Sequence, residues 1–582
     1  MQIRFAALTL LLLTLLPLEA LSSDGGRYWV RFKPDYFNTE AKRQELHNRL
    51  LQNGFKPFRT SKWLNAVSGV STPVERATIQ TWPEVVEVRA VATFSKRDSS
   101  YSKNKTFLQK TTATESKYGL NLAAYELCNI PEAHNALDSI TATQGVYGKG
   151  VKIAIFDAGF TLRHESIKHL LDSQIIAKRD YVRPLWDTAF AGSFDTVVEN
   201  EPGDHYKQEE HGTSVLSLIA GKKDGVLYGV APAASFILAK TELTYKAKIN
   251  SPGDTSWEES EIAEEEDNWI AAVEWAVDTM GAQIISSSLG YRNGFTDGTP
   301  DYPNSWMDGK TIPITIAAES AYVHGAIVVK SMGNGFHNVI TTLSAPADGK
   351  NTVAVGAVDA NGVLAIYSSS GPTFDGRVKP DVLAPGHLIS AAVGRTSQYS
   401  SLTGTSFAAP LAAGMLALAI QYDTLSGKNL PNDSLIQRIR KTAFSPAGLD
   451  TSTLGWGYGI MNAYSVMTGI RDSSITKPVN RGEILFRAGP VPVKLGEEFT
   501  FMGFTDNLSI ENERTDTLKV SIFTLSGKQV VKLKKNEAAV GSKTALSWNM
   551  LNSDGLQVAP GIYLYMAEFK QKTFRGKVAV IR

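Results

Sequence analysis

The stretch VKIAIFD, residues 151–157, is a short run of β-branched and other apolar residues that ends on a carboxylate. Further runs of the same kind follow it, separated by stretches with helical spacing. They are SFILAKT (235–241), AQIISSSLG (282–290), GAIVVKSMG (325–333) and NTVAVGAV (351–358). Continuous apolar strands that alternate with helices predict an α/β fold, with a doubly wound, mostly parallel sheet covered by helices on both faces.

Small or polar residues stand at the carboxyl ends of three of these runs. They are Asp157, Ser288 to Gly290, and Gly333 to Gly335. In open α/β sheets, ligands bind beyond the carboxyl ends of the strands. The sequence therefore predicts a functional site at that edge of the sheet.

Three residue types needed for serine acyl transfer occur in suitable surroundings. That chemistry requires a hydroxyl nucleophile, an imidazole base, a carboxylate that orients the imidazole, and donors for the oxyanion. Asp157 ends an apolar strand, His211 opens a helical pattern, and Ser406 precedes small residues that allow a buried helix to begin there. A helix N-terminus adds positive potential at the nucleophile. Taken alone, each residue also has an ordinary interpretation, such as an N-cap serine.

Six segments together resemble the subtilisin-like (subtilase) serine peptidases, and they occur in that family's order. They are VKIAIFDAGF (151–160), HGTSVLSLIAG (211–221), SSSLG (286–290), MGNG (332–335), YSSSGPTFDGRVKPDVLAPG (367–386) and GTSFAAP (404–410). The resemblance implies a subtilisin-like fold and a secreted endopeptidase that cleaves proteins or peptides through an acyl-enzyme. No cofactor is required for this chemistry. Structural calcium can bind such proteins, but the scattered oxygen ligands of this sequence do not locate a site.

The resemblance also assigns catalytic roles. Ser406 would be the nucleophile, His211 the general base, and Asp157 the carboxylate that orients His211. The side-chain amide of Asn334 would donate to the oxyanion beside the Ser406 backbone N–H.

The substrate-binding residues that the resemblance implies lie in two segments. Ser288, Leu289 and Gly290 would pair with the substrate main chain as an added strand. The primary specificity pocket would be lined by the strand that includes Ser331, Met332 and Gly333, and by residues 345–348. The sequence leaves open whether Met332 narrows this pocket and whether the neighbouring Lys330 points into it.

Two features depart from the family pattern. Ser214 stands where most members have a second histidine, which leaves the three catalytic residues intact. The segment Thr241 to Asp267 is a polar, acidic insertion, and EEEDNW (264–269) lies at its end. We expect a solvated helix start whose carboxylates are favoured by the helix dipole. The alternative is an acidic surface that attracts basic substrates.

The N-terminal region contains three expected parts. Residues 1–22 have a basic residue, an apolar run and small residues, typical of a cleaved secretory signal peptide, with a short membrane anchor as the alternative. Residues 23–96 follow the β-α-β-β-α-β order of a ferredoxin-like unit and resemble the subtilase propeptide, an intramolecular inhibitor. The polar stretch 97–117 is the expected processing linker, cleaved either at Lys96-Arg97 by a trypsin-like enzyme or nearer Tyr118 by the protein itself.

The expected peptidase domain, 118–470, precedes a region with a different pattern. Residues 471–582 alternate strands and turns, which predicts a small all-β sandwich. This region resembles the sorting domain of the type IX secretion system of Bacteroidetes, so secretion machinery is an expected partner and the protein is expected to be secreted or at the cell surface after export through the periplasm. AGPVP (488–492) replaces the usual opening motif of such domains, so an immunoglobulin-like adhesive module is the alternative.

Composition excludes several other function classes. Basic and acidic residues number 59 and 58, so bulk charge gives no reason to expect binding to nucleic acid. The single cysteine, Cys128, cannot form an intramolecular disulfide and is expected to be a small buried residue. The other histidines lack the spacing of a zinc site, which argues against a metallopeptidase. We expect no membrane span.

Two functional alternatives stay open at this point. One is a catalytically silent binding or adhesion protein on the subtilase scaffold. The other is a processing peptidase with one or few protein targets.

Overall fold

The structure of the protein is a computed structural model, and it describes most of the chain. The described residues are 26–90, 116–136, 145–182, 210–242, 245–251, 254–259, 264–292, 301–335, 341–394, 397–444, 455–471, 484–489, 493–494, 499–505, 517–536, 543–569 and 572–581. The chain divides into two compact units, Met1–Val91 and Ala92–Arg582. The predicted signal peptide and most of the predicted linker lie outside the described residues.

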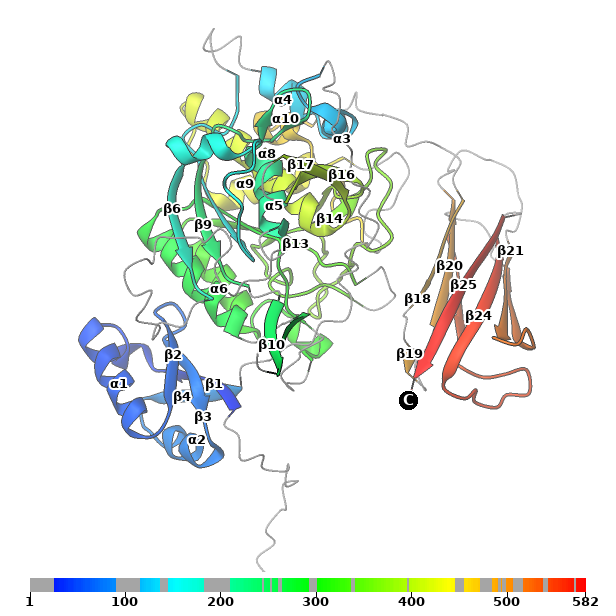
Figure 1. The fold of residues 1–582 in the computed structure, drawn as a ribbon, viewed down its shortest axis with the longest axis horizontal. Helices are drawn as coiled ribbons and strands as arrows, with labels where there is room; N and C mark the ends of the chain where they lie inside the picture. The colour runs from blue at the N-terminus through cyan, green and yellow to red at the C-terminus, as the bar shows by residue number, and fades with distance from the viewer. Residues whose placement is uncertain are drawn as a thin grey trace, which may run out of the picture. The chain divides into compact units, whose positions relative to one another are not determined.

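The first unit is a four-stranded antiparallel sheet with two helices (Figure 1). Its elements are β1 (Gly26–Phe32), α1 (Glu40–Gln52), β2 (Lys56–Ser61), β3 (Ala66–Ser71), α2 (Pro73–Gln80) and β4 (Val85–Ala90). The chain order and the sheet order β2-β3-β1-β4 confirm the predicted ferredoxin-like arrangement. Leu50 of α1 and Ile79 of α2 are buried in one core with Val30 of β1, so both helices cover the same face of the sheet.

The second unit contains a seven-stranded sheet in which every pairing is parallel. Its strands are β5 (Lys152–Asp157), β6 (Ile175–Asp180), β9 (Ser235–Lys240), β12 (Ile284–Ser287), β13 (Ile327–Ser331), β14 (Val353–Val358) and β15 (Val382–Pro385). In the sheet order β15-β14-β13-β12-β5-β9-β6, the chain runs outward from β12 to β15 on one side, and on the other side it forms the edge strand β6 before it returns to place β9 next to β5. This confirms the predicted doubly wound α/β fold, whose strand order reverses between β5 and β12.

Helices cover both faces of this sheet (Figure 1). Those that position the site are α5 (Glu210–Ala220), α6 (Glu264–Glu274), α7 (Pro313–Val323) and α8 (Thr405–Leu425). Buried side chains of α5 and α8 share one core with Ile153 and Ile155 of β5. On the other face, the Trp269 ring of α6 packs edge-on against Phe156 of β5, with ring centroids 5.6 Å apart. Side chains alternate between the faces of a strand, so consecutive residues of β5 contact different helix layers.

Helix α8 lies largely inside the peptidase core. Among the described residues it is the one helix long and apolar enough to cross a membrane by length and composition, and 83% of that apolar window is buried inside the protein. Cys128 is buried in the same core, as predicted.

The C-terminal part of the second unit has a core of its own. A three-stranded sheet (β18-β20-β23) and a five-stranded sheet (β19-β25-β24-β21-β22) share buried residues that include Phe501, Trp548 and Val520. The strands are β18 (Ile484–Gly489), β19 (Val493–Lys494), β20 (Phe499–Thr505), β21 (Thr517–Thr524), β22 (Gln529–Asn536), β23 (Lys543–Trp548), β24 (Gly561–Phe569) and β25 (Lys572–Ile581). The predicted all-β sandwich is therefore confirmed; among its described strands, the one parallel pairing is β19 with β25.

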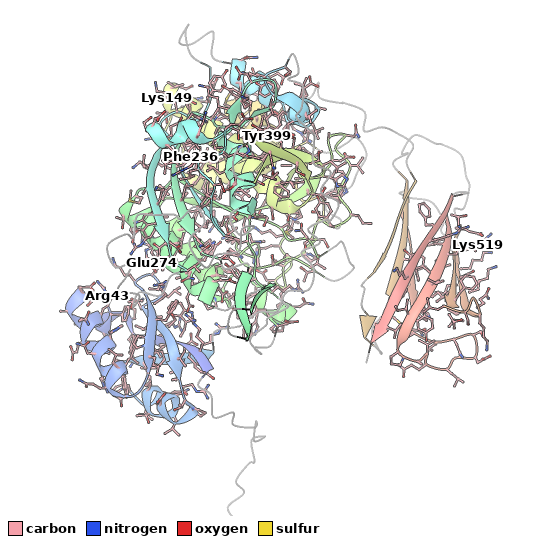
Figure 2. All side chains as sticks on the ribbon, in the orientation of Figure 1. Arg43, Lys149, Phe236, Glu274, Tyr399 and Lys519 are labelled. Carbon is pink, nitrogen blue, oxygen red and sulfur yellow. The ribbon has the colours of Figure 1, made fainter. Side chains whose placement is uncertain are left out.

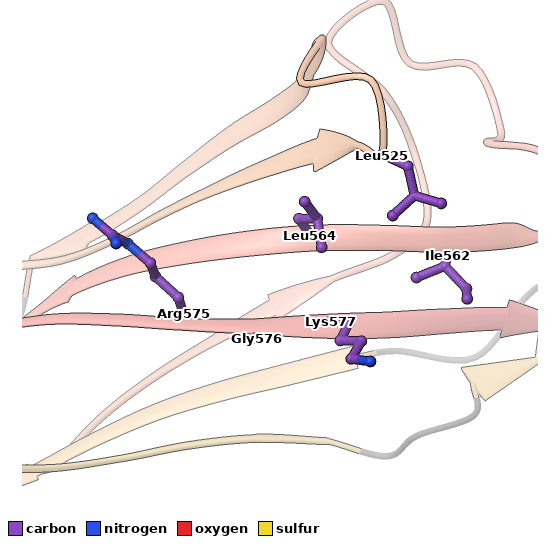
Figure 3. Close-up of a pocket in the computed structure, with 6 residues that line it drawn as sticks. All are labelled: Leu525, Ile562, Leu564, Arg575, Gly576 and Lys577. Carbon is purple, nitrogen blue, oxygen red and sulfur yellow. The ribbon is translucent and has the colours of Figure 1, made fainter.

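The five-stranded sheet carries a shallow hollow of about 410 Å³ (Figure 3). It is lined by Leu525, Ile562, Leu564, Arg575, Gly576 and Lys577. The hollow combines exposed apolar side chains with two cations, and none of its lining residues is a hydroxyl nucleophile or a carboxylate. It therefore has none of the features expected of the peptidase site.

One glutamine of α8 fixes the loop that leads into β5. Gln421 Oε1 accepts hydrogen bonds from the backbone N–H groups of Tyr147, Gly148 and Lys149, at 2.9, 2.6 and 3.0 Å. Figure 2 labels Lys149 in this loop. A single carbonyl oxygen thus satisfies three consecutive donors, which would otherwise lose their partner.

We expect Gln421→Leu to destabilise the peptidase core by about 2 kcal/mol, because it removes the acceptor of three backbone donors without replacing it. Gln421→Glu keeps an oxygen at the same place and is the matched control. Thermal unfolding should show a transition lowered by several degrees for the leucine variant alone. Equal stability of the leucine variant and the wild type would contradict this role.

Candidate active site

Asp157 and His211 form a hydrogen-bonded pair at the carboxyl edge of the sheet. Asp157 is the last residue of β5 and is fully buried, and His211 is the second residue of α5. His211 Nδ1 lies 2.8 Å from Asp157 Oδ1 and 2.9 Å from Oδ2. Asp157 Oδ1 also accepts the Ala158 N–H at 2.8 Å. A neutral imidazole held in this way carries its proton on Nδ1 and presents an unprotonated Nε2 as a base.

Gly212 allows α5 to approach β5 closely enough for this pair to form. A Cβ atom at position 212 would lie 2.1 Å from the carbonyl oxygen of Gly159 and 3.0 Å from Asp157 Cβ. The neighbouring Thr213 Oγ1 accepts the Thr161 N–H at 2.8 Å, which adds a second link between α5 and the segment after β5. The backbone contact therefore requires the glycine that follows His211.

Ser406 is the second residue of α8, as the sequence predicted for a helix that begins at the serine. Its Oγ donates to the carbonyl oxygen of Ser288 at 3.2 Å, and Ser288 Oγ donates to the carbonyl oxygen of Ser406 at 2.7 Å. The next residue, Phe407, has its ring centroid 5.8 Å from that of His211. Ser406 and His211 thus lie in neighbouring positions, but the hydroxyl bonds to Ser288 rather than to the imidazole. Long or missing hydrogen bonds between nucleophile and base are common before substrate binds.

The amide of Asn334 is oriented by the first residue of α8. Asn334 Oδ1 accepts from both the backbone N–H and the Oγ1 hydroxyl of Thr405, each at 3.0 Å. Because Oδ1 faces two donors, the Nδ2 group must point the other way, and it has no hydrogen-bond partner among the described residues. Its two N–H bonds are therefore available at the start of α8, beside the Ser406 backbone.

The predicted substrate-binding segment after β12 has main-chain groups that no other described residue occupies. Ser288 contacts Ser406 through both its hydroxyl and its carbonyl oxygen. Leu289 is half-buried and Gly290 is exposed, and neither forms a backbone hydrogen bond to another described residue. These residues can pair with an extended peptide.

The predicted segment after β13 is tied to α8 and to the next strand. Ser331 and Met332 are buried, and the Met332 N–H donates to Val355 O at 2.8 Å. Gly333 has a φ of +109°, which favours glycine, and its N–H donates to Thr405 Oγ1 at 3.2 Å. The structure therefore brings this segment beside the start of α8.

Residues 344–348 lie beside both substrate-binding segments, the one after β12 and the one after β13. Tyr291 and Ala345 exchange two backbone hydrogen bonds, at 3.0 and 2.9 Å, and the Ser344 N–H donates to Met332 O at 3.4 Å. Lys330 is fully buried, and its Nζ donates to Ser344 Oγ at 3.1 Å and to the carbonyl oxygen of Ser331. Burial lowers the pKa of Lys330 to about 7, an effect that the charge of Asp348 opposes.

Sequence reasoning missed Thr405 and Ser344. Thr405 lies inside the quoted GTSFAAP segment, but its link to Asn334 spans 71 residues and has no local signal. Ser344 is an ordinary loop serine in the sequence, and only the fold brings it to the Lys330 ammonium. Ser214, the departure from the family pattern, donates to Ala392 O at 2.7 Å and so ties α5 to the chain near α8.

The expected solvated helix start in the acidic insertion is wrong in one respect. A helix does begin at Glu264, but Glu265, Glu266 and Asp267 are buried. The hydroxyl of Tyr302 donates to Glu266 Oε2 at 2.8 Å, and that of Tyr291 donates to Glu242. Tyrosines from later segments thus supply the donors that solvent would otherwise provide.

The described residues contain no group of three or more His, Cys, Asp or Glu side chains that could hold a metal ion. His164, one of the histidines considered above, bonds through its two ring nitrogens to Ser166 Oγ and to the carbonyl oxygen of Gln398, at 3.0 and 2.9 Å.

Comparison with known proteins agrees with this arrangement. A model of the Subtilase family matches residues 148–459, which hold β5, α5, β12, β13 and the start of α8. Subtilisin DY of Bacillus licheniformis is 29% identical over 293 residues, which cover 50% of this chain and 84% of that protein. The major intracellular serine protease of Bacillus subtilis is 30% identical over 325 residues, or 55% of this chain and 84% of that protein. The chain therefore belongs to the subtilase family and is a serine-type endopeptidase.

Proposed function

We propose that this protein is a secreted serine endopeptidase, made as a zymogen, in which Asp157, His211, Ser406 and Asn334 carry out the reaction. The observation that carries the assignment is the convergence of these residues at one edge of the parallel sheet. Asp157 ends β5, His211 begins α5, and Ser406 begins α8 next to the oriented amide of Asn334. A silent scaffold would have no need to keep this set together.

The proposed first step begins with rotation of the Ser406 hydroxyl from Ser288 O toward His211 Nε2. His211 takes the hydroxyl proton as Ser406 Oγ attacks the scissile carbonyl carbon, and Asp157 stabilises the resulting imidazolium. Asn334 Nδ2 and the Ser406 backbone N–H donate to the oxyanion. These hydrogen bonds gain strength as the negative charge develops.

Collapse of the tetrahedral intermediate breaks the peptide C–N bond. The leaving amine takes its proton from His211 Nε2, and the acyl group stays on Ser406 Oγ as an ester. Water then attacks this ester with His211 again acting as base, which releases the carboxylic acid and restores the hydroxyl. Ser288, Leu289 and Gly290 would hold the substrate main chain as an added strand.

We also propose that the first unit is the inhibitory propeptide and that residues 471–582 are the sorting region. The ferredoxin-like arrangement of residues 26–90 and the sandwich of residues 484–581 support these proposals. Structural calcium stays a proposal without an assigned site.

The nucleophile can be tested directly. We expect the purified mature protein to cleave casein and to be labelled by a fluorophosphonate, with the label on the peptide that contains Ser406. Ser406→Ala should abolish labelling and lower kcat by at least about 10³-fold. Ser401→Ala, a nearby serine of β17 (Gln398–Leu402), is the control and should keep both activities.

Failure of the wild-type protein to cleave or to be labelled would instead favour the silent adhesion protein. Cleavage of a single target from a proteome-derived peptide library, without general casein hydrolysis, would favour the narrow processing peptidase.

The oxyanion donor gives a second prediction. Asn334→Ala should lower kcat by about 10²- to 10³-fold, the loss known for removal of such a donor from a subtilisin, because the amide is needed in the transition state. KM should change little. Asn361→Ala, which alters an exposed asparagine in the turn after β14, is the matched control. A loss confined to KM would argue against an oxyanion role.

Maturation gives a third prediction. The N-terminal sequence of secreted protein should begin within or just after the linker 97–117, and the intact mass should show loss of residues 471–582 if they act in sorting. Lys96→Ala with Arg97→Ala separates the two cleavage routes. Unchanged processing in this variant, together with accumulation of the precursor for Ser406→Ala, would show self-cleavage. A secreted Ser406→Ala protein that is fully processed would show that another peptidase acts.

A further inference from the structure

The ammonium group of Lys330 lies between the two segments that flank Ser406. A Cβ atom at Gly290 would lie 2.5 Å from Lys330 Nζ and 2.3 Å from Ser344 Oγ. Gly290 comes two residues after Ser288, which bonds to Ser406. Lys330 Nζ and Ser344 Oγ therefore lie against the backbone of Gly290, in the segment expected to hold the substrate main chain.

The segment after β13, which contains Gly333, is also close to Ser344 Oγ. A Cβ atom at Gly333 would lie 3.2 Å from Ser344 Oγ. The Gly333 N–H is itself bonded to Thr405, the residue before Ser406. Lys330 Nζ and Ser344 Oγ thus form a polar pair between Gly290 and Gly333, and both glycines belong to segments that contact the start of α8.

This lysine is buried without a carboxylate partner among the described residues. Lys330 has no salt bridge to a described carboxylate, and its donors go to Ser344 Oγ and Ser331 O. Asp348, the charged group that acts on it, has its own oxygens bonded to Thr315 Oγ1 and to the Gly309 N–H, at 2.7 and 2.9 Å. A buried cation without a counter-ion is unfavourable.

Another buried lysine of the same domain shows how this fold satisfies a structural ammonium group. Lys379 Nζ donates to Asp381 Oδ2 at 2.7 Å, and Arg440 bonds to the other oxygen of the same carboxylate. Lys379 therefore has its anion within the protein. Lys330 has no carboxylate in direct contact among the described residues, although both side chains are almost completely buried.

We propose that Lys330 determines the substrate specificity of this site, and that the enzyme cleaves after residues with a carboxylate side chain, glutamate or aspartate. The proposal rests on the proposed function, because it places the substrate next to Ser406. A carboxylate entering between Gly290 and Gly333 would accept a hydrogen bond from Ser344 Oγ and a charge-assisted one from the third N–H of Lys330 Nζ, once this fully buried ammonium turns toward it. The substrate would thereby supply a carboxylate in direct contact with the ammonium, which no described residue does.

A substrate series on the wild-type protein tests this without any substitution. The probes are peptide p-nitroanilides of one sequence whose last residue is Glu, Asp, Gln, Phe or Lys. We expect kcat/KM for Glu to exceed that for its neutral isostere Gln by roughly 10- to 100-fold, the size expected for a buried charge pair. A Gln or Phe substrate cleaved as fast as the Glu substrate would overturn the proposal.

Lys330→Met removes the charge and keeps an unbranched side chain of similar length. We expect the Glu-to-Gln ratio of kcat/KM to fall to about 1 or below, while hydrolysis of the Gln substrate and fluorophosphonate labelling persist. Lys441→Met, which removes an exposed lysine of α9 (Asn432–Thr442), should leave the ratio unchanged. Lys330 could instead have only a structural role, through its hydrogen bonds to Ser331 and Ser344. Lys330→Met would then lower activity on all substrates alike, and that result would contradict the proposal.

The Glu-to-Gln ratio should also depend on pH. Lys330 is charged below its pKa of about 7 and neutral above it, so the ratio should fall between about pH 7 and pH 9. His211 must be neutral for both substrates and cancels in the ratio. Asp348 is the charged group that acts on Lys330, and the two residues paired with Lys330 on the neighbouring strands, Ser287 on β12 and Ala354 on β14, are uncharged. A ratio that stays constant from pH 6 to pH 9 would contradict recognition by the ammonium.

The two proposals fail in different ways. If no substrate is cleaved and Ser406 is not labelled, the proposed function is wrong. If casein and neutral substrates are cleaved and Ser406 is labelled, but acidic residues are not preferred, only the assignment of Lys330 is wrong.

Discussion

The burial of α8 against the parallel sheet is the constraint on which the site depends. Its apolar residues share one core with β5, β12, β13 and α5, so the position of its first turn is set by the packing of the whole helix. Gly414 marks how close this packing is, since a Cβ atom there would lie 2.6 Å from Val230 Cβ. Interiors packed to this density transmit small shifts. Ser406 is therefore held by a rigid element, even though its hydroxyl can rotate.

Thr405 converts this packing into a defined site. Its hydroxyl and N–H bind Asn334 Oδ1, and its hydroxyl also accepts from the Gly333 N–H. The segment after β13 is thereby fixed to the start of α8, and the Asn334 amide has one orientation. The Asp157 and His211 pair is fixed independently, through β5 and the close contact at Gly212. The site thus has two parts that are held in place independently. Helix α8 holds the nucleophile and the oxyanion donors, and β5 with α5 holds the base and its carboxylate.

The fold and the main site residues were predictable because their signals are local. Apolar runs indicated the strands, and the residue after each run lies at the carboxyl edge for simple reasons of chain direction. The helix that begins at Ser406 followed from small residues on its C-terminal side. Gly212 follows His211 in the quoted histidine segment. The structure explains this glycine, because a side chain there would collide with the carbonyl oxygen of Gly159.

The surroundings of the charged residues were not predictable, since burial depends on partners distant in sequence. The run EEEDNW has the composition of a solvated helix start, yet Glu266 is buried because Tyr302, 36 residues later, donates to it. Lys379 is different, because its partner Asp381 is only two residues away and a sequence reader can anticipate the pair. Lys330 has no such neighbour, and its hydrogen bond to Ser344 spans 14 residues. The sequence around Lys330 therefore gives no sign of its burial, because the side chain that its ammonium bonds comes from a different loop.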